Sequence, residues 1–350
     1  MATARRDRVA KVVAGIGDAG LRNLRAASRD HQSWLQRRRV AFSFIRRLDP
    51  FSLASLVFGL VVSISGGGSV RASEAKIWEE FSGEKALAHV ERLVDFGPRP
   101  PASDGIEKSR DYIENQLRLS GWQVTRQSFT DDTPRGKVHF VNLIARFAGQ
   151  GKAAPSFLLC SHYDTKTFDT IRFVGANDGG SSTGLLLELG RVLGRHGNLA
   201  ARIELVFFDG EEAYDHYSEN DGLYGSRYFA RQLQASGAKQ FRGGILFDMV
   251  GQRSLKITLP MDSPAEMARD IFASAEALKL RNYFSYFDRE MTDDHTPLNR
   301  IGIPTLDMID FDFAWWHTAD DTIDKLSAQS LQVVGSVAAY YLSEFALKRE

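Results

Sequence analysis

The chain has 350 residues, enough for one large α/β domain or two small ones, and its 43% hydrophobic and 25% charged residues are ordinary for a soluble globular protein. The formal net charge is zero, but residues 1–50 hold twelve Lys and Arg against four Asp and Glu, so the rest of the chain carries about eight net negative charges. That acidic remainder lacks the clustered basic face of a nucleic-acid-binding protein, and we expect no nucleic acid partner. The single cysteine, Cys160, excludes an internal disulfide.

The N-terminal segment has the layout of an export signal. Arg37-Arg38-Arg39 and Arg46-Arg47 precede an apolar stretch, residues 51–65, which small residues follow. About fifteen residues is short for a membrane span, so the pattern predicts export to the periplasm or the medium, with residues 51–65 as a possible membrane anchor. The alternative is a buried helix of the folded domain. We therefore predict an N-terminal segment over residues 1–74 and one folded domain over 75–350.

The folded part begins with helical patterns and then alternates between strands and helices. Residues 74–120 read as helical with an interruption at residues 96–101, and a β region follows over 122–129 and 138–147. Further strands are expected over 157–163, 203–208, 244–250 and 305–309, and the helices between and after them over 183–195, 224–235, 264–278 and 328–347. This alternation predicts an α/β fold with a mixed, mostly parallel central sheet flanked by helices on both faces.

Potential metal ligands follow the carboxyl ends of four predicted strands. The strands end in or lead to His162-Tyr163-Asp164, Glu211-Glu212, Asp248 and Trp316-His317, and a glycine-rich loop after the first of them contains Asp178. Open α/β sheets bind their ligands beyond these strand ends. Taken singly, each residue is more typical of a turn, a helix cap or a structural hydrogen bond. Their convergence on one edge of the sheet predicts a shared site.

The adjacent carboxylates Glu211 and Glu212 are costly to ionise together at the end of a buried strand. A divalent cation removes the conflict by binding one of them and leaving the other free for proton transfer. Asp248 lies inside an otherwise apolar strand, and a buried carboxylate needs a partner. A set of carboxylates and imidazoles without a cysteine thiolate suits a catalytic zinc ion with an open position.

These residues together resemble the zinc-dependent aminopeptidase superfamily, and within it the glutaminyl cyclase branch. The specific marks are the runs 162–166, 208–214, 223–227 and 316–318, together with Asp293-Asp294-His295-Thr296-Pro297. The resemblance spans about residues 85 to 345. It implies that residues 75–350 form one zinc-dependent catalytic domain that acts on peptide or protein N-termini.

The resemblance also implies a role for each site residue. Asp178, Glu212 and His317 would hold one Zn²⁺, and Glu211 would be the general acid and base, in a hydrogen-bonded carboxylate network with Asp248 and Asp293. His162 would bind a second metal or support the first site, and Asp164 would support His162 or Glu211. Trp316, Tyr217 and His295 would line the substrate pocket. Tyr217, Thr292 and the segment 310–315 depart from animal members of the branch, which puts the substrate preference in doubt.

Three functions remain open at this stage. The first is cyclisation of an N-terminal glutamine to pyroglutamate with release of ammonia. The second is an aminopeptidase, in which Asp178 would bridge two zinc ions and Glu211 would activate water. The third is a binding module without catalysis, which the filled ligand positions disfavour.

Overall fold

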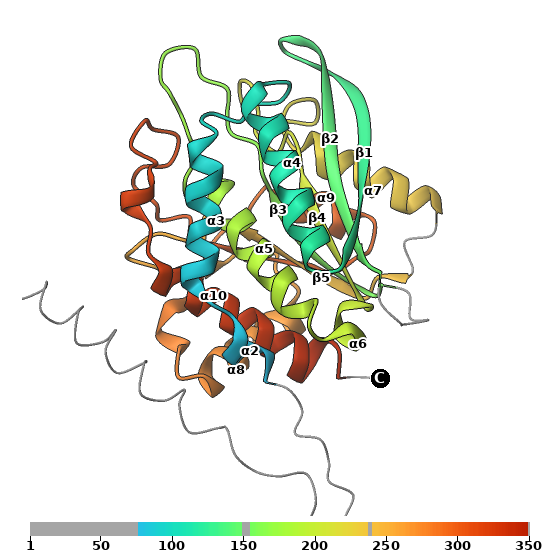
Figure 1. Cartoon of the computed structure of the whole chain (residues 1–350), viewed down its shortest axis with the longest axis vertical. Coiled ribbons are helices and arrows are strands. Elements are labelled where there is room, and N and C mark those ends of the chain that lie inside the picture. The colour runs from blue at the N-terminus through green and yellow to red at the C-terminus, as the bar shows by residue number, and fades with distance from the viewer. Residues whose placement is uncertain (1–75, 149–154, 237–239, 349–350) are drawn as a thin grey trace, which may run out of the picture. The chain divides into compact units, whose positions relative to one another are not determined.

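The computed structural model describes residues 76–148, 155–236 and 240–348, which belong to one compact unit over Arg71–Glu350 (Figure 1). The predicted export signal or anchor, including residues 51–65, lies outside the described residues and stays a prediction. No helix in the described part of the chain is both long and apolar enough to cross a membrane.

One eight-stranded sheet organises the domain, in the order β1-β2-β4-β3-β5-β8-β6-β7. The strands are β1 (Trp122–Thr133), β2 (Gly136–Phe147), β3 (Phe157–His162), β4 (Ile203–Phe208), β5 (Gly243–Asp248), β6 (Ile257–Leu259), β7 (Phe284–Tyr286) and β8 (Thr305–Ile309). Strands β4, β3, β5 and β8 run parallel, whereas β1 pairs with β2, β2 with β4, and β6 with β8 in antiparallel fashion. The predicted mixed, mostly parallel sheet is confirmed.

Helices connect the strands close to the predicted positions. They are α2 (Ile77–Glu80), α3 (Gly83–Asp95), α4 (Asp104–Leu119), α5 (Gly180–Leu193), α6 (Gly197–Ala200), α7 (Tyr224–Ser236), α8 (Ala265–Ala277), α9 (His295–Arg300) and α10 (Ala328–Tyr341). The sequence patterns did not predict β6, β7, α6 or α9. These elements have three to six residues each, too few for a period of 2 or 3.6 to stand out.

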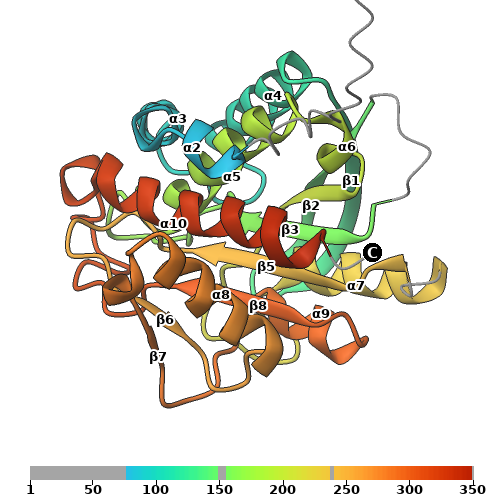
Figure 2. The same ribbon diagram turned by 90° about the horizontal axis from the view of Figure 1, so that it is seen from below.

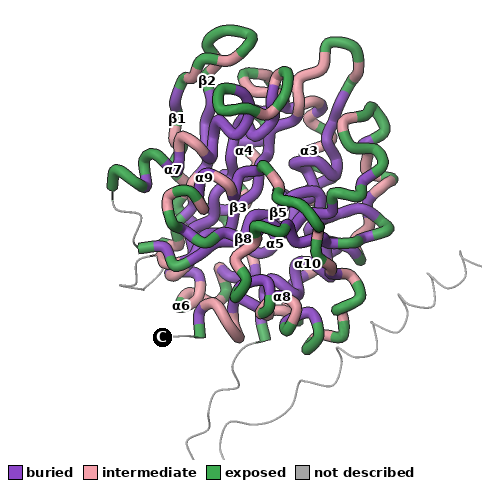
Figure 3. The backbone as a smooth tube through the Cα atoms, turned by 180° about the vertical axis from the view of Figure 1, so that it is seen from behind, coloured by how far each residue is buried: buried purple, intermediate pink, exposed green. Residues whose placement is uncertain are grey.

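Both faces of the central strands are covered by helices. Along β3, Phe157 and Leu159 belong to the large core with α3, α4, α5, α8 and α10, whereas Leu158 and Cys160 pack in a smaller core with α7 and α9. This alternation follows from side chains that point to opposite faces at successive strand positions. Figure 2 shows α3, α5 and α10 on one side of the sheet, and Figure 3 shows the buried strands between the layers.

The parallel strands bring their carboxyl ends to one edge of the sheet. β3 ends at His162 and β5 at Asp248, and β4 is followed by the turn that contains Glu211 and Glu212. Gly210 makes that turn with φ of 71°, and a Cβ there would lie 2.5 Å from the Phe140 ring. Only glycine fits this position without strain. This turn and the parallel strand ends together bring the predicted ligand residues to one edge of the sheet.

Truncating the centre of the sheet should destabilise the domain strongly. Leu205, in β4, is fully buried in the large core. We expect Leu205→Ala to lower the free energy of unfolding by about 2–5 kcal/mol, because it removes apolar contacts and leaves a cavity. The matched control is Leu119→Ala, at a leucine with 75% of its surface exposed, which should change stability by less than about 0.5 kcal/mol. Equal losses in urea unfolding would contradict this view of the core.

Candidate metal centre and cavity

Three predicted ligands meet at one point. The Nε2 atom of His317 lies 3.4 Å from Oδ2 of Asp178 and 3.1 Å from Oε2 of Glu212. A tetrahedral zinc ion with bonds of about 2.0–2.1 Å separates its ligand atoms by roughly 3.3 Å. Oδ2 of Asp178 is buried and accepts no hydrogen bond from the described residues. The three residues are therefore spaced as ligands of one ion.

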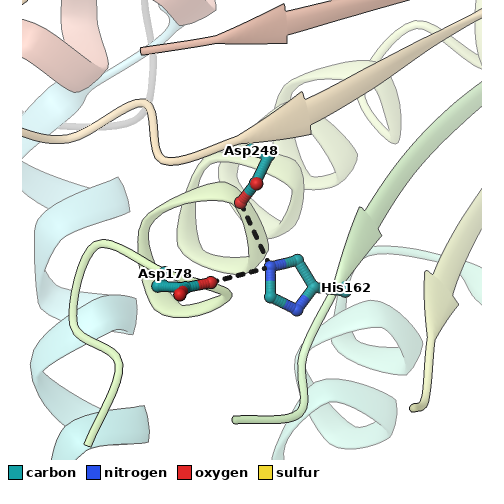
Figure 4. A group of neighbouring side chains, drawn as sticks. All are labelled: His162, Asp178 and Asp248. Carbon is teal, nitrogen blue, oxygen red and sulfur yellow. Dashed lines mark hydrogen bonds and ion pairs between the residues drawn. The ribbon is translucent and has the colours of Figure 1, made fainter. Parts of the chain in front are cut away.

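A second group shares Asp178 with the first. Figure 4 shows the His162 ring between two carboxylates, with Nε2 at 3.1 Å from Oδ1 of Asp248 and 3.3 Å from Oδ1 of Asp178. The other ring nitrogen, Nδ1, lies 3.5 Å from Oδ1 of Asp164. All four side chains are buried or nearly so. The donor atoms of His162, Asp178 and Asp248 are close enough together to bind a second metal ion. Without such an ion, the three residues bond one another beside the first ligand group.

The electrostatics of both groups suit a cation. Burial acts to raise the pKa of Asp178, yet the neighbouring His162 and His317 rings hold that pKa well below its ordinary value. Burial acts to lower the pKa of His317, yet Asp178 and Glu212 raise it to about 9. The raised pKa of His317 reports the negative charge of these carboxylates, which a divalent cation would neutralise.

The loop that carries Asp178 is held from behind by Asp321. The Asp321 carboxylate accepts hydrogen bonds from the backbone N–H groups of Asn177, at 2.7 Å, and Asp178, at 3.1 Å. Asp321 follows His317 by four residues, so one loop supplies a ligand and fixes the backbone of another. Gly179 comes next with φ of 73°, and a Cβ there would lie 2.6 Å from the Asp164 carbonyl oxygen. The close approach of this loop to β3 requires glycine.

Asp164 positions the paired glutamates through their backbone. Its Oδ1 accepts the N–H of Glu211 at 3.1 Å and its Oδ2 accepts the N–H of Glu212 at 3.3 Å. The side chain that approaches His162 thus also fixes the turn after β4. Sequence resemblance assigned Asp164 a supporting role for either His162 or Glu211, and the structure places it beside both.

Aromatic rings fix the orientation of His317. Its imidazole stacks on Trp316, with ring centroids 4.0 Å apart, and meets Phe168 and Phe173 edge-on. The backbone of His317 has φ of 56°, in the left-handed region that few non-glycine residues adopt. Such strain persists where surrounding contacts over-determine a conformation, and it is common at functional sites.

A cavity of about 40 Å³ opens beside these ligands. Its walls include Asp178 and the proposed catalytic carboxyls, together with aromatic and apolar side chains; the lining residues are Asp178, Glu211, Tyr217, Asp248, Met249, Met291, Thr292, Asp293, Ile309, Phe311 and Trp316. The predicted pocket residues Trp316 and Tyr217 thus line the cavity. His295 is not among the lining residues; it is buried at the start of α9, where its Nε2 bonds Oδ2 of Asp262 at 3.1 Å.

The three carboxyls of the predicted network face this cavity, but the hydrogen bonds we find run to other partners. Tyr217 donates its hydroxyl to Oε2 of Glu211 at 3.0 Å. Asp248 bonds His162, and Oδ1 of Asp293 accepts the backbone N–H of Asp294. Burial raises the pKa of Glu211 well above its ordinary value; the charges of Asp293 and Glu212 raise it too, while His162 lowers it. Such a pKa suits a proton carrier at neutral pH.

Two residues near the site were not predicted from the sequence. Asp307 lies in the apolar strand β8, and this is the same signal that drew attention to Asp248 in β5. Arg99 is fully buried and donates to the carbonyl oxygens of Tyr163, Val174 and Gly175, which joins β3 to the Asp178 loop. No spacing in the sequence relates Arg99 to those distant carbonyls.

Comparisons with known proteins agree with this geometry. Residues 142–342 match the model of peptidase family M28. The chain is 31% identical to a glutaminyl-peptide cyclotransferase-like protein of Bos taurus, over 71% of this chain and 72% of the relative. Among solved structures it is similar to an Acidobacteriales bacterium glutaminyl cyclase, with 33% identity, a TM-score of 0.70, and coverage of 75% of this chain and 94% of that one. A Zn-dependent exopeptidase from Parabacteroides distasonis is also similar, with 25% identity, a TM-score of 0.69, and coverage of 75% and 98%.

Metal analysis of two histidine variants separates the ligand groups. We expect His317→Ala to lose most of the bound zinc, because it removes a ligand, whereas His162→Ala should keep about one equivalent per chain. Inductively coupled plasma mass spectrometry of the purified proteins measures both ratios. Two equivalents in the unchanged protein, with one lost in His162→Ala, would contradict the single-ion assignment.

Proposed function

The chain belongs to peptidase family M28 and is an enzyme of the glutaminyl cyclase type, and we propose that it uses one zinc ion, with Glu211 as the proton carrier. The reaction converts the N-terminal glutamine of a peptide to pyroglutamate and releases ammonia. One observation carries the assignment of roles: Glu211, Asp248 and Asp293 face the same cavity as the ligand Asp178.

The proposed reaction consumes no water. The substrate's α-amine attacks its own side-chain amide carbonyl, so one C–N bond forms and the bond to the departing ammonia breaks. Because both groups belong to one residue, the attack is intramolecular and its entropic cost is small. Glu211 takes a proton from the attacking amine and returns a proton to the leaving nitrogen. Trp316 provides an apolar wall that holds the glutamine side chain.

Asp178, Glu212 and His317 would hold the metal at the wall of this cavity. When bound, zinc would polarise the substrate's amide carbonyl as a Lewis acid, and its charge would favour the ionised form of Glu211. Tyr217 orients the carboxylate by donating its hydroxyl to Oε2 of Glu211. Asp164 fixes the backbone of the same residue. Glu211 is thus held from two sides, with Oε1 left for the substrate.

The alternative is an aminopeptidase, which the likeness to a zinc exopeptidase keeps open. In that reaction Glu211 would activate water, and His162 and Asp248 would hold a second ion with Asp178. The 31% and 33% identity to the cyclotransferase relative and the bacterial glutaminyl cyclase, against 25% to the exopeptidase, favours the cyclase.

The pattern of residues 37–65 supports a further proposal, that the enzyme is exported and acts on peptides outside the cytoplasm. Export would be measured by locating the full-length protein in fractions of the cells that express it.

A peptide assay distinguishes the two reactions. We expect Gln-Ala to release ammonia without free amino acids, and Leu-Ala to remain intact. Free leucine would instead identify a hydrolase. Glu211→Gln should lower turnover by at least about 100-fold, because it removes the proton carrier, while the zinc content stays unchanged. Activity that survives this substitution would assign the proton transfer to another residue.

Removing the Tyr217 hydroxyl should weaken catalysis without removing the metal. We expect Tyr217→Phe to lower kcat about tenfold, the loss of one hydrogen bond to a charged group. Tyr214 lies in the same loop and packs on the Tyr224 ring. Tyr214→Phe is the matched control and should leave kcat within about twofold. Steady-state kinetics on Gln-Ala measures both, and similar losses in the two variants would point to the loop's stability instead.

A further inference from the structure

Buried polar atoms beside the substrate cavity lack hydrogen-bond partners among the described residues. They are Nδ1 of His295, Oδ2 of Asp293 and both carboxylate oxygens of Asp307. We refer to these three side chains, each at most 3% exposed, as the β8 group. One ligand atom of each side chain lies within 4.8 Å of the corresponding atoms of the other two. Burying polar atoms without partners is costly, so the β8 group lacks an interaction that the described residues do not supply.

The fold brings the β8 group together from two segments. In β8, Leu306 and Met308 point into the large core, so Asp307 between them points to the opposite face. Helix α9, which begins at His295, packs on β8 (Figure 2). Asp293 precedes this helix and lines the cavity. The β8 group is therefore next to the cavity but separate from the two ligand groups described above.

The hydrogen bond of His295 leaves its second nitrogen ready to bind a cation. Its Nε2 bonds Oδ2 of Asp262 at 3.1 Å, and a carboxylate can only accept, so Nε2 carries a proton and Nδ1 has a free lone pair. Histidines that bind metals commonly donate their other N–H to a carboxylate in this way. Nδ1 lies 3.8 Å from Oδ2 of Asp307, too far for a hydrogen bond. Two ligands of one ion can be up to about 4.2 Å apart when each bond is about 2.1 Å long.

A second proton on His295 is the rival explanation. The imidazolium would direct its Nδ1–H toward Asp307, and Oδ2 of Asp293 would still have no partner among the described residues. One metal ion can bind all three side chains at once. Two carboxylates and an imidazole suit a divalent transition-metal ion such as zinc, whereas calcium and magnesium prefer oxygen ligands alone. A metal ion therefore accounts for more of the unpartnered atoms than a proton does.

We propose that Asp293, His295 and Asp307 form an additional metal site, which Zn²⁺ fills reversibly. In the first ligand group, Nε2 of His317 is 3.1 and 3.4 Å from the carboxylate oxygens, against 3.8 Å between His295 and Asp307. An ion must draw the β8 group together, so it binds there more weakly and leaves on dialysis. Its binding takes Oδ2 of Asp293 away from the substrate, so excess zinc inhibits the enzyme. Only this inhibition rests on the proposed function.

Equilibrium dialysis against Zn²⁺ counts the ions. We expect about one equivalent after dialysis and another when Zn²⁺ is added. Asp307→Asn removes a ligand with little change in shape and should lose the additional equivalent, whereas His162→Ala should keep it. Asp262→Asn changes only the partner of His295 and should weaken the additional binding about 10–100-fold. The matched control is Asp288→Asn, at an aspartate with 90% of its side chain exposed, which should bind both ions like the unchanged protein.

Anomalous X-ray scattering locates the additional ion in the unchanged protein, so this measurement does not depend on the folding of a variant. Crystals soaked in Zn²⁺ should give a peak between Asp293, His295 and Asp307. The proposal is overturned if no additional ion binds, if the peak lies beside His162 instead, or if the additional equivalent survives Asp307→Asn.

Activity tests the consequence for Asp293. Saturating Zn²⁺ should lower kcat on Gln-Ala about tenfold, the loss of one interaction with a charged group, and Asp307→Asn should resist this fall. Turnover that stays unchanged while the ion binds would overturn the predicted inhibition. Absence of pyroglutamate in the unchanged protein would contradict the proposed function, and dialysis and scattering would still test the metal site.

Discussion

The crowding of buried carboxyls at one edge of the sheet is the constraint on which the rest of the structure depends. Glu211, Glu212, Asp178, Asp248 and Asp293 lie together with little access to water. Ionised carboxylates cannot be buried side by side without compensation, because desolvation and mutual repulsion both oppose the charge. The imidazoles of His162 and His317 lie against these carboxylates, and the proposed zinc ion would compensate more of their charge. The chemistry of the site follows from which carboxyl receives which partner.

Much of the fold and of the ligand set could be predicted because their signals are local. In the sequence, each buried strand of six residues ends in a polar residue or is followed closely by one. The patterns of β3, β4 and β5 therefore predicted His162, the paired glutamates and Asp248 as site residues. The parallel topology then predicted that these residues converge, since it brings those strand ends to one edge of the sheet. The mixed sheet was predictable for the same reason.

The sequence patterns do not predict the supporting residues, because the groups that these residues bond are distant in the sequence. Asp321 bonds Asn177, 144 residues away, and Arg99 reaches carbonyls in two other segments. Asp307 is a different case. It carries the same signal as Asp248, a carboxyl in an apolar strand, but it does not end its strand, so the pattern of ligands at strand ends does not include it. His295 was expected to line the pocket because its motif adjoins Asp293, yet the start of α9 turns it toward Asp262.

The double use of Asp178 bears on how many ions the site needs. One oxygen of Asp178 faces His317 and the other faces His162. An ion held by Asp178, Glu212 and His317 would compensate the charge on the first side. On the second side, the two ring nitrogens of His162 face Asp248 and Asp164, so an imidazole lies between these carboxylates. The proposed single ion leaves this second side to His162. Glu211 is bonded by Tyr217 rather than by an imidazole, and this is the carboxyl to which we assign the proton transfer in the proposed reaction.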